Sequence, residues 1–307
     1  MDDKEKPIIL ATRGSALALR QSGSVKVLLE RALEKQGIPR RVEIATVRTQ
    51  GDRDRLHSLV SIGGKGLFVR AIEEELLNGR ADIAVHSAKD LPYELSDGLV
   101  IAGVPACADF RDCLLMNGTM SIEKLKAIPH SVIGTGSPRR RMELLRMFPG
   151  AVFAENRGNI PTRIRKLREG RFDAIVLAQA GLDRLPMDLG DLTVCPLSVD
   201  ECLPAACQGI LAVECRAEDS RMRDLLGTLS DPDSYLRFSM ERNLFTGMKA
   251  DCSMAVGAHA DILDSPGKEE RTVVLTAMYE GRKASVSGFV REYPELCRQL
   301  ARRVMSR

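Results

Sequence analysis

Tryptophan is absent from this chain of 307 residues, and aromatic residues make up only 4% of it. Proteins that bind single-stranded nucleic acids usually stack the bases on aromatic side chains, and this chain has few to offer. Its formal net charge of +3 at pH 7 is also small for a protein that binds a polyanion through charge alone. We therefore expect no nucleic-acid partner.

Long apolar runs are missing as well. No segment approaches the roughly 20 apolar residues that a membrane span requires, so we expect no contact with a membrane. The first six residues, MDDKEK, are charged and of mixed sign, which does not fit a secretory signal. These absences predict a cytoplasmic protein, and a length of 307 residues is enough for two or three domains.

The patterns of metal sites and nucleotide sites are also missing. The chain has eight cysteines, but none of them forms a C-x-x-C pair and their spacing fits no zinc site. The GGKG loop at 63–66 has the composition of a phosphate-binding P-loop but not its spacing. We expect reduced thiols, no disulfide framework and no metal.

Arginine is in excess, with 33 arginines against 12 lysines. The guanidinium fork matches carboxylate and phosphate groups in two-point contacts. A general bias toward arginine would explain much of the excess, so the positions of the arginines are more informative than their number. Those that follow predicted strands are Arg13, Arg139, Arg140, Arg157, Arg163 and Arg184.

Two parts of the chain share one pattern, which predicts two related α/β domains. In the first, the strand at 8–12 is followed by RGS and a helix, and in the second the strand at 131–135 is followed by GSPRRR and a helix. Ser15 and Ser137 stand at the N-cap positions of the two helices. A Gly-Arg-x-Asp frame before an apolar strand also occurs in both parts.

Segments rich in small residues predict where the chain passes between these domains. One lies at 98–110, and the other is PAACQG at 204–209. After them, an amphipathic helix at 235–245 and alternating strands predict a small α+β tail. The predicted division is therefore domain 1 at 1–105 plus 210–228, domain 2 at 106–209 and domain 3 at 229–307.

The segment ADIAVHSAKDL at 81–91 places His86, Ser87, Lys89 and Asp90 after a buried strand. In open α/β sheets, ligands bind beyond the carboxyl ends of the strands. Helix N-termini that carry arginines favour anions, and the composition favours an organic polycarboxylate over nucleic acid. We expect these groups to form a cleft between the two domains that holds such an anion. In that cleft, Asp90 faces a cation or exchanges protons with an amine, although a plain ion pair is an equal alternative.

Cys252 lies in the loop KADCSMAVG, between a predicted helix and a predicted strand. A loop thiol acts as a nucleophile or as a covalent anchor. A packed structural cysteine is the alternative that the local sequence favours.

Taken together, the motifs resemble the porphobilinogen deaminase family, also called hydroxymethylbilane synthases. The resemblance covers nearly the whole chain. The matching segments are ATRGSALAL at 11–19, GGKGLF at 63–68, ADIAVHSAKDLP at 81–92, IGTGSPRRR at 133–141, RGNIPTR at 157–163, LAQAGLDRL at 177–185, CQGILAVECR at 207–216 and the loop around Cys252.

The resemblance implies an α/β fold, with two type II periplasmic-binding-protein-like domains and a small C-terminal α+β domain. It also implies a dipyrromethane cofactor, held through a thioether by the cysteine that matches Cys252. Enzymes of this family join four porphobilinogen molecules head to tail in haem biosynthesis and release four ammonia molecules. The product is the linear tetrapyrrole hydroxymethylbilane, and we expect a monomer.

The resemblance assigns roles to particular residues. Asp90 matches the catalytic carboxylate, and Phe68 with the glycine-rich loop before it matches a mobile segment that covers the site. The residues that match binders of substrate and cofactor are Arg13, Ser15, Gln21, Ser87, Lys89, Thr135, Ser137, Arg139, Arg140, Arg157, Arg163, Arg184 and Gln208.

Several positions depart from the family pattern. Ser61 replaces a usual lysine, Ala250-Asp251 replaces a usual Gly-Gly pair before the anchor, Cys207 replaces a usual glycine, and Ala255 replaces a usual proline. Because Asp90 and Cys252 remain, we expect an active enzyme. The rival interpretation is a non-catalytic, two-lobed anion-binding protein, which needs neither of these two residues.

Overall fold

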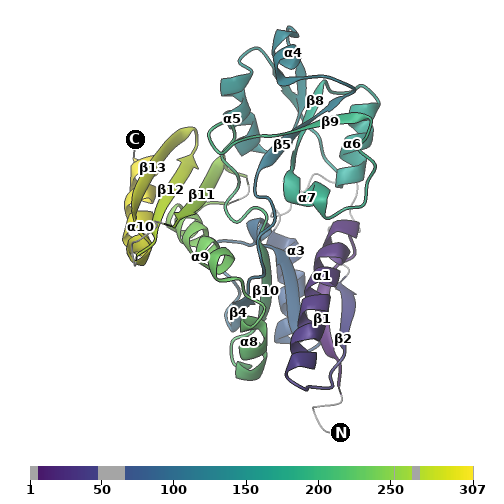
Figure 1. The fold of residues 1–307 in the computed structure, drawn as a ribbon, viewed down its shortest axis with the longest axis vertical. Coiled ribbons are helices and arrows are strands. Elements are labelled where there is room, and N and C mark those ends of the chain that lie inside the picture. Colours follow the sequence, from purple (N-terminus) through teal and green to yellow (C-terminus); the bar gives the residue numbers. More distant parts are fainter. Residues whose placement is uncertain (1–5, 48–65, 252, 265–269, 307) are drawn as a thin grey trace. The chain divides into compact units, whose positions relative to one another are not determined.

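The structure, a computed structural model, describes residues 6–47, 66–251, 253–264 and 270–306 (Figure 1). The chain forms two compact units. The first is made of Met1–Ala108 and Ile210–Phe238, and the second of Asp109–Gly209 and Ser239–Arg307. The chain thus leaves the first unit after residue 108 and returns to it at residue 210.

The first unit contains a five-stranded sheet with the order β2-β1-β3-β10-β4. Strand β1 is parallel to both β2 and β3, whereas β10, which follows the return of the chain, is antiparallel to β3 and β4. The strands are β1 (Ile8–Arg13), β2 (Val42–Val47), β3 (Ile83–Ser87), β4 (Leu99–Gly103) and β10 (Leu211–Arg216).

Helices cover both faces of this sheet. Helices α1 (Ala16–Lys35) and α8 (Ser220–Gly227) pack on one face, and α3 (Gly66–Leu77) packs on the other. The strands are apolar on both sides for this reason, as strands of covered parallel sheets are. Ser15 caps α1 as predicted, since its side chain accepts a hydrogen bond from the Ala18 N–H at 3.3 Å.

The second unit repeats this arrangement in a sheet with the order β7-β6-β8-β5-β9. Here β6 is parallel to β7 and β8, and β5, which follows the first crossing of the chain, is antiparallel to β8 and β9. The strands are β5 (Asp112–Asn117), β6 (Val132–Gly134), β7 (Val152–Ala154), β8 (Ala174–Ala178) and β9 (Leu192–Pro196). The prediction of two related α/β sheets is confirmed.

Two pairs of helices enclose this second sheet. Helices α4 (Ile122–Ala127) and α5 (Pro138–Met147) pack on one face. Helices α6 (Ile160–Arg168) and α7 (Gln179–Asp183) pack on the other. Ser137 caps α5 through the Arg140 N–H, and Pro138 occupies the first turn, as the sequence predicts.

The tail contains helix α9 (Pro232–Gly247) and a three-stranded antiparallel sheet. Its strands are β11 (Val256–Leu263), β12 (Thr272–Tyr279) and β13 (Arg282–Phe289). Helix α10 (Tyr293–Met305) packs on β12 and β13, as the yellow part of Figure 1 shows. The predicted α/β fold with a small C-terminal α+β part is thus confirmed.

Buried polar contacts attach this tail to the rest of the second unit. Glu143 on α5 is 1% exposed and accepts hydrogen bonds from Lys283 Nζ at 3.1 Å and from the Leu203 N–H at 2.9 Å. Glu241 on α9 accepts from the N–H groups of Cys207 and Ala260 at 2.5 and 3.1 Å. These contacts join the tail to the part of the second unit that contains α5. The predicted boundaries of three domains stay a prediction.

Candidate functional site

In the first unit, polar side chains gather at one edge of the sheet. Arg13 ends β1 and Ser87 ends β3, and the two strands are parallel and adjacent. Their carboxyl ends therefore meet at the same edge, which is where ligands of open α/β sheets bind. Lys89 and Asp90 follow at once in a 3-10 turn at Ala88–Asp90 and are half-buried.

Hydrogen bonds fix the turn that carries Asp90. Gln21 on α1 donates from Nε2 to Ser87 Oγ at 2.9 Å, and the hydroxyl lies 3.2 Å from Gln21 Oε1. The Ala88 N–H donates to the Ile210 carbonyl at 3.0 Å, which ties the turn to the returning chain. Because Ala88 and Leu91 are buried on either side of Asp90, its carboxylate is carried by an anchored segment.

His86, the first polar residue of the motif, has a partner within the sheet. Its Nε2 lies 2.9 Å from Glu214 Oε2 on β10, and both side chains are buried. The pair connects β3 to β10 directly before the Asp90 turn. His86 thus holds together the strands that support the site.

In the second unit, the carboxyl ends of three parallel strands carry the predicted ligands of anions. Thr135 and Ser137 follow β6, with the Ser137 N–H donating to Thr135 Oγ1 at 3.2 Å. Arg157 and Arg163 follow β7, and Arg163 Nε donates to the Gly158 carbonyl at 2.7 Å. Arg184 follows β8 and α7 and donates to the Gly209 carbonyl at 2.7 Å.

Arg139 and Arg140 are placed differently, because both are buried against Asp112. Arg139 Nη1 donates to Asp112 Oδ2 at 2.6 Å and to the Leu203 carbonyl at 2.6 Å. Arg140 donates to Asp112 Oδ1 from Nε at 3.0 Å and from Nη2 at 2.7 Å. Gln208 Nε2 donates to the same oxygen at 3.0 Å. Direct binding of a ligand carboxylate by these two arginines stays a prediction.

Asp112 is a central residue of the second unit that the sequence did not single out. It is 0% exposed and begins β5. Burial alone would raise the pKa of the Asp112 carboxyl, but the charges of Arg139 and Arg140 and their hydrogen bonds hold it well below its usual range. The available signal was an aspartate directly before the apolar run CLLM, in a chain that also has an arginine triplet.

The described cysteines form no disulfide among themselves. Burial raises the pKa of Cys113, Cys202 and Cys297 to about 12 and that of Cys215 to about 11. Thiolates are the reactive form of cysteine. These four thiols are therefore poor candidates for carrying a covalent group.

Cys207 has a backbone conformation that favours glycine. Its φ is +60°, in the left-handed region that costs a side chain of L configuration roughly 1–2 kcal/mol. The glycine that the resemblance implies at this position would avoid this cost, and Cys207 keeps the same turn at that cost. The N–H of Cys207 donates to Glu241, which holds the strained residue in place.

The loop before the predicted anchor Cys252 also accommodates Ala250 and Asp251, which stand where the resemblance implies two glycines. Lys249 takes the left-handed conformation after α9, with a φ of +48°. Ala250 and Asp251 have no positive φ. The Asp251 carboxylate accepts from the Ser253 N–H at 2.7 Å and from the Ser253 hydroxyl. Cys252 itself, the side chain of Phe68 and Ser61 lie outside the described residues.

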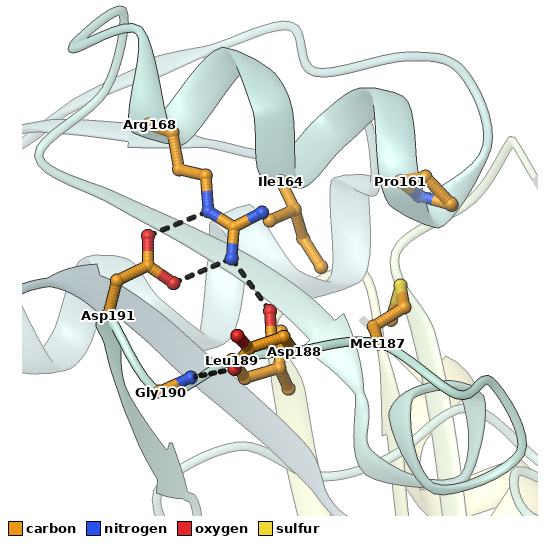
Figure 2. Close-up of a pocket in the computed structure, with 8 residues that line it drawn as sticks. All are labelled: Pro161, Ile164, Arg168, Met187, Asp188, Leu189, Gly190 and Asp191. Atoms are coloured by element: carbon orange, nitrogen blue, oxygen red, sulfur yellow. Dashed lines mark hydrogen bonds and ion pairs between the residues drawn. The ribbon is translucent and has the colours of Figure 1, made fainter.

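A surface pocket of about 540 Å³ lies between α6 and the segment at 187–191 (Figure 2). Arg168 donates from Nε and Nη2 to the two carboxylate oxygens of Asp191 and from Nη2 to the Asp188 carbonyl. None of the predicted site residues lines this pocket. It is therefore separate from the polar strand ends described above.

Asn156, beside Arg157, is 1% exposed, and neither its Oδ1 nor its Nδ2 has a hydrogen-bond partner among the described residues. An unsatisfied buried polar group costs about 1–3 kcal/mol. Asn156→Leu, which is similar in size, is expected to raise the free energy of unfolding by up to that amount, measured by urea denaturation.

Asn117→Leu is the control for a satisfied amide, because Asn117, an exposed residue, donates from Nδ2 to the Leu167 carbonyl at 2.9 Å. Removing this satisfied amide is expected to lower the free energy of unfolding. Equal destabilisation by both substitutions would contradict the account of Asn156.

Among the described residues, no helix combines the length and the apolar character needed to cross a bilayer. The same part of the chain contains no cluster of three or more metal-ligating side chains. Each unit instead presents charged and hydroxyl side chains at the carboxyl edge of a doubly covered sheet. This defines an α/β protein whose two sheets each carry charged and hydroxyl side chains at the carboxyl ends of their strands.

Comparison with known proteins gives the family. The model described as "Porphobilinogen deaminase, dipyromethane cofactor binding domain" matches residues 8–224. A porphobilinogen deaminase of Streptococcus sanguinis is 38% identical over 97% of this chain and 95% of its own length. Another, of Sulfurimonas denitrificans, is 39% identical over 84% of this chain and 80% of its own length.

A weaker structural similarity is found to the periplasmic VFT2 domain of Bordetella pertussis BvgS. It has a TM-score of 0.41 and 14% identity, and it covers 74% of this chain and 87% of that one.

The chain belongs to the porphobilinogen deaminase family. It is an enzyme of tetrapyrrole synthesis with a dipyrromethane cofactor-binding domain, which favours the enzyme over the non-catalytic anion-binding protein.

Proposed function

We propose that the chain joins four porphobilinogen molecules into hydroxymethylbilane on a dipyrromethane attached to Cys252 through a thioether. At each addition the aminomethyl C–N bond breaks, ammonia leaves, and a C–C bond forms to a pyrrole carbon that loses its proton. After the fourth addition, the C–C bond between the dipyrromethane and the first added ring breaks: a proton returns to the pyrrole carbon of the cofactor, and water supplies the hydroxyl group of the product. The observation that carries this proposal is the anchored turn after β3, which presents Asp90 beside Lys89 at the carboxyl edge of the sheet.

The donor set of the second unit fits a group that carries carboxylates. Arg157, Arg163, Thr135 and Ser137 lie around the turns after β6 and β7. One of these turns already holds a carboxylate, because Glu155 Oε2 accepts from Arg157 Nε at 2.7 Å. When bound, the dipyrromethane supplies the pyrrole carbon that accepts the first substrate ring.

The chain's own residues divide the remaining work between binding and proton transfer. Acetate and propionate groups of the substrate and cofactor suit arginine, since its fork gives two-point contacts with a carboxylate. The proposed ligands are Arg13, Ser15, Gln21, Ser87, Lys89, Thr135, Ser137, Arg139, Arg140, Arg157, Arg163, Arg184 and Gln208. Arg139 and Arg140 also hold the second unit together through Asp112.

Asp90 has the chemistry for the bond-breaking step. Loss of ammonia leaves a cation on the substrate carbon, and a nearby carboxylate stabilises it. The same group assists proton transfer to the departing amine and accepts the proton of the pyrrole carbon after coupling. We assign Phe68 to shielding this cation from water.

We further propose that porphobilinogen is the small-molecule substrate and that the enzyme acts as a cytoplasmic monomer without nucleic acid or membrane. In this proposal one thiol, that of Cys252, carries the cofactor. The function can therefore be tested by replacing that thiol.

The active protein as purified is expected to give a colour with acidic aldehyde reagent for pyrroles and to have a mass above that of the bare polypeptide. Cys252→Ser is expected to lose both signals and all turnover. Cys195→Ser, which changes a half-buried thiol elsewhere, should keep them. An active protein that has the bare polypeptide mass would overturn the proposal.

A further inference from the structure

Glu155 is an acidic residue in the turn of the second unit that carries Arg157. It follows β7, and its Oε2 accepts from Arg157 Nε at 2.7 Å. Arg163 Nε and Lys166 Nζ donate to the carbonyls of Gly158 and Arg157 in the same turn. The Glu155 carboxylate thus pairs with Arg157 in a turn whose backbone carbonyls accept hydrogen bonds from two further cationic side chains.

The Glu155 carboxylate lies against the turn at Thr135–Ser137, which we propose to bind ligand carboxylates. A Cβ atom at position 136 would lie 3.1 Å from Glu155 Oε2, so the carboxylate packs directly on the Gly136 backbone. Gly136 stands between Thr135 and Ser137, immediately before α5. Glu155 therefore lies where a ligand held by this turn and by Arg157 would place its own carboxylate.

The contact is suited to exchange. The side chains of Glu155 and Arg157 are 64% and 54% exposed, respectively. Exposed ion pairs contribute little to folding, so an incoming carboxylate can replace Glu155 without disturbing the unit. Because Glu155 is two residues from Arg157, its effective concentration is high, on the order of millimolar or above. A ligand with one weakly held carboxylate competes poorly against such a neighbour.

We propose that Glu155 is a specificity-determining residue: it keeps Arg157 paired until a carboxylate of a pyrrole that is also held at other points displaces it. This rests on the proposed function, because it takes Arg157 as a ligand of pyrrole carboxylates. The arrangement favours ligands with several carboxylates over simple organic acids. The displacing group is a carboxylate of either an incoming substrate ring or the cofactor.

The test uses the full-length protein and a non-reactive probe, the pyrrole acetate–propionate diacid that lacks the aminomethyl group. Its Kd is measured by calorimetry at low salt for the wild type and for Glu155→Gln. The expected tightening is about two- to fivefold, the factor that corresponds to an exposed ion pair. Glu169→Gln is the matched control, since Glu169 pairs with Arg165 and Arg171 away from this turn.

A second arm distinguishes the two sources of the carboxylate. Cofactor-free protein is mixed with limiting porphobilinogen, and covalent loading is followed by intact mass. Faster loading of Glu155→Gln with an unchanged Kd would assign the displaced contact to the cofactor, and a tighter Kd would assign it to the substrate ring. The proposal would be overturned if Glu155→Gln bound the diacid no more tightly, and loaded no faster, than Glu169→Gln.

Arg157→Gln separates this failure from failure of the proposed function. If Arg157→Gln weakens binding or loading while Glu155→Gln improves neither, only the role of Glu155 is wrong. If Arg157→Gln behaves as wild type in both arms, the assignment of Arg157 fails and the role of Glu155 fails with it. In the Arg157→Gln background, Glu155→Gln is expected to have no further effect.

Discussion

Asp112→Asn is expected to destabilise the protein by about 3–5 kcal/mol, the range found when one partner of a buried ion pair is removed. The substitution keeps the shape but removes the charge that two buried guanidinium groups share. Arg139 and Arg140 are 3% and 7% exposed, so water cannot replace the lost carboxylate. The measurement is the midpoint of urea unfolding at pH 7.

Asp109→Asn provides the matched control three residues earlier. Asp109 pairs with Arg111 at 2.7 Å, but this pair is partly exposed. Exposed pairs are typically worth up to about 1 kcal/mol, and the control should stay within that limit. If Asp112→Asn lowers the free energy of unfolding no more than Asp109→Asn does, the buried ion pairs of Asp112 do not stabilise the second unit.

The stability difference between the wild type and Asp112→Asn is also expected to depend on pH. The two arginines lower the pKa of Asp112 in the folded protein, whereas in the unfolded chain an aspartate titrates near 3.9. The unfolded state therefore binds more protons in acid, and the stabilisation is complete above about pH 5 and is lost as the pH falls below about 4. The difference in stability between wild type and Asp112→Asn should narrow between pH 5 and pH 3.

Local patterns in the sequence were sufficient to predict the elements and their repeat. Apolar periodicity and caps depend on neighbours within one turn, and Ser15 and Ser137 cap α1 and α5 as expected. The Gly-Arg-x-Asp frame also has a local reason: Asp82 and Asp173 each accept a hydrogen bond from the backbone of a neighbouring strand. The frame therefore marks the same contact in both sheets.

The partners of charged residues could not be predicted in this way, because distant segments supply them. Asp112 reaches Arg139 and Arg140 only because β5 enters the second sheet antiparallel to β8. Likewise, Glu214 on β10 reaches His86 after the chain has returned from the second unit. Sequence spacing contains no sign of these pairings, so two arginines that look like ligands in the sequence also prove to be structural.

The position of Asp90 was predictable because the site lies where a strand ends. The apolar run before His86 forms β3, and the polar residues that follow take up the 3-10 turn at the edge of the sheet. What the sequence could not supply was the support for that turn. The bonds of Ser87 with Gln21 and of Ala88 with Ile210 come from α1 and from the returning segment.

Asp90→Asn is expected to lower turnover by about a hundred- to ten-thousandfold, the usual contribution of a group that transfers protons. The amide keeps the size of the side chain but neither holds a cation nor accepts a proton. A carboxylate about 4 Å from a cation contributes roughly 4 kcal/mol at an effective dielectric constant near 20, which corresponds to roughly a thousandfold in rate, within this range. Asp90→Glu, which keeps the charge, should retain part of the activity.

Folding and substrate binding distinguish a catalytic role from a structural one. Asp90 is only half-buried, and its turn is held by Ser87 and Ala88, so Asp90→Asn should unfold at nearly the wild-type urea concentration. The Kd of the non-reactive pyrrole diacid should also change little, because other residues bind its carboxylates. Asp97→Asn, at an exposed aspartate of the same unit, should keep full turnover. Near-normal turnover in Asp90→Asn would show that the Asp90 carboxylate does not carry out the chemistry, even if neighbouring residues bind the substrate.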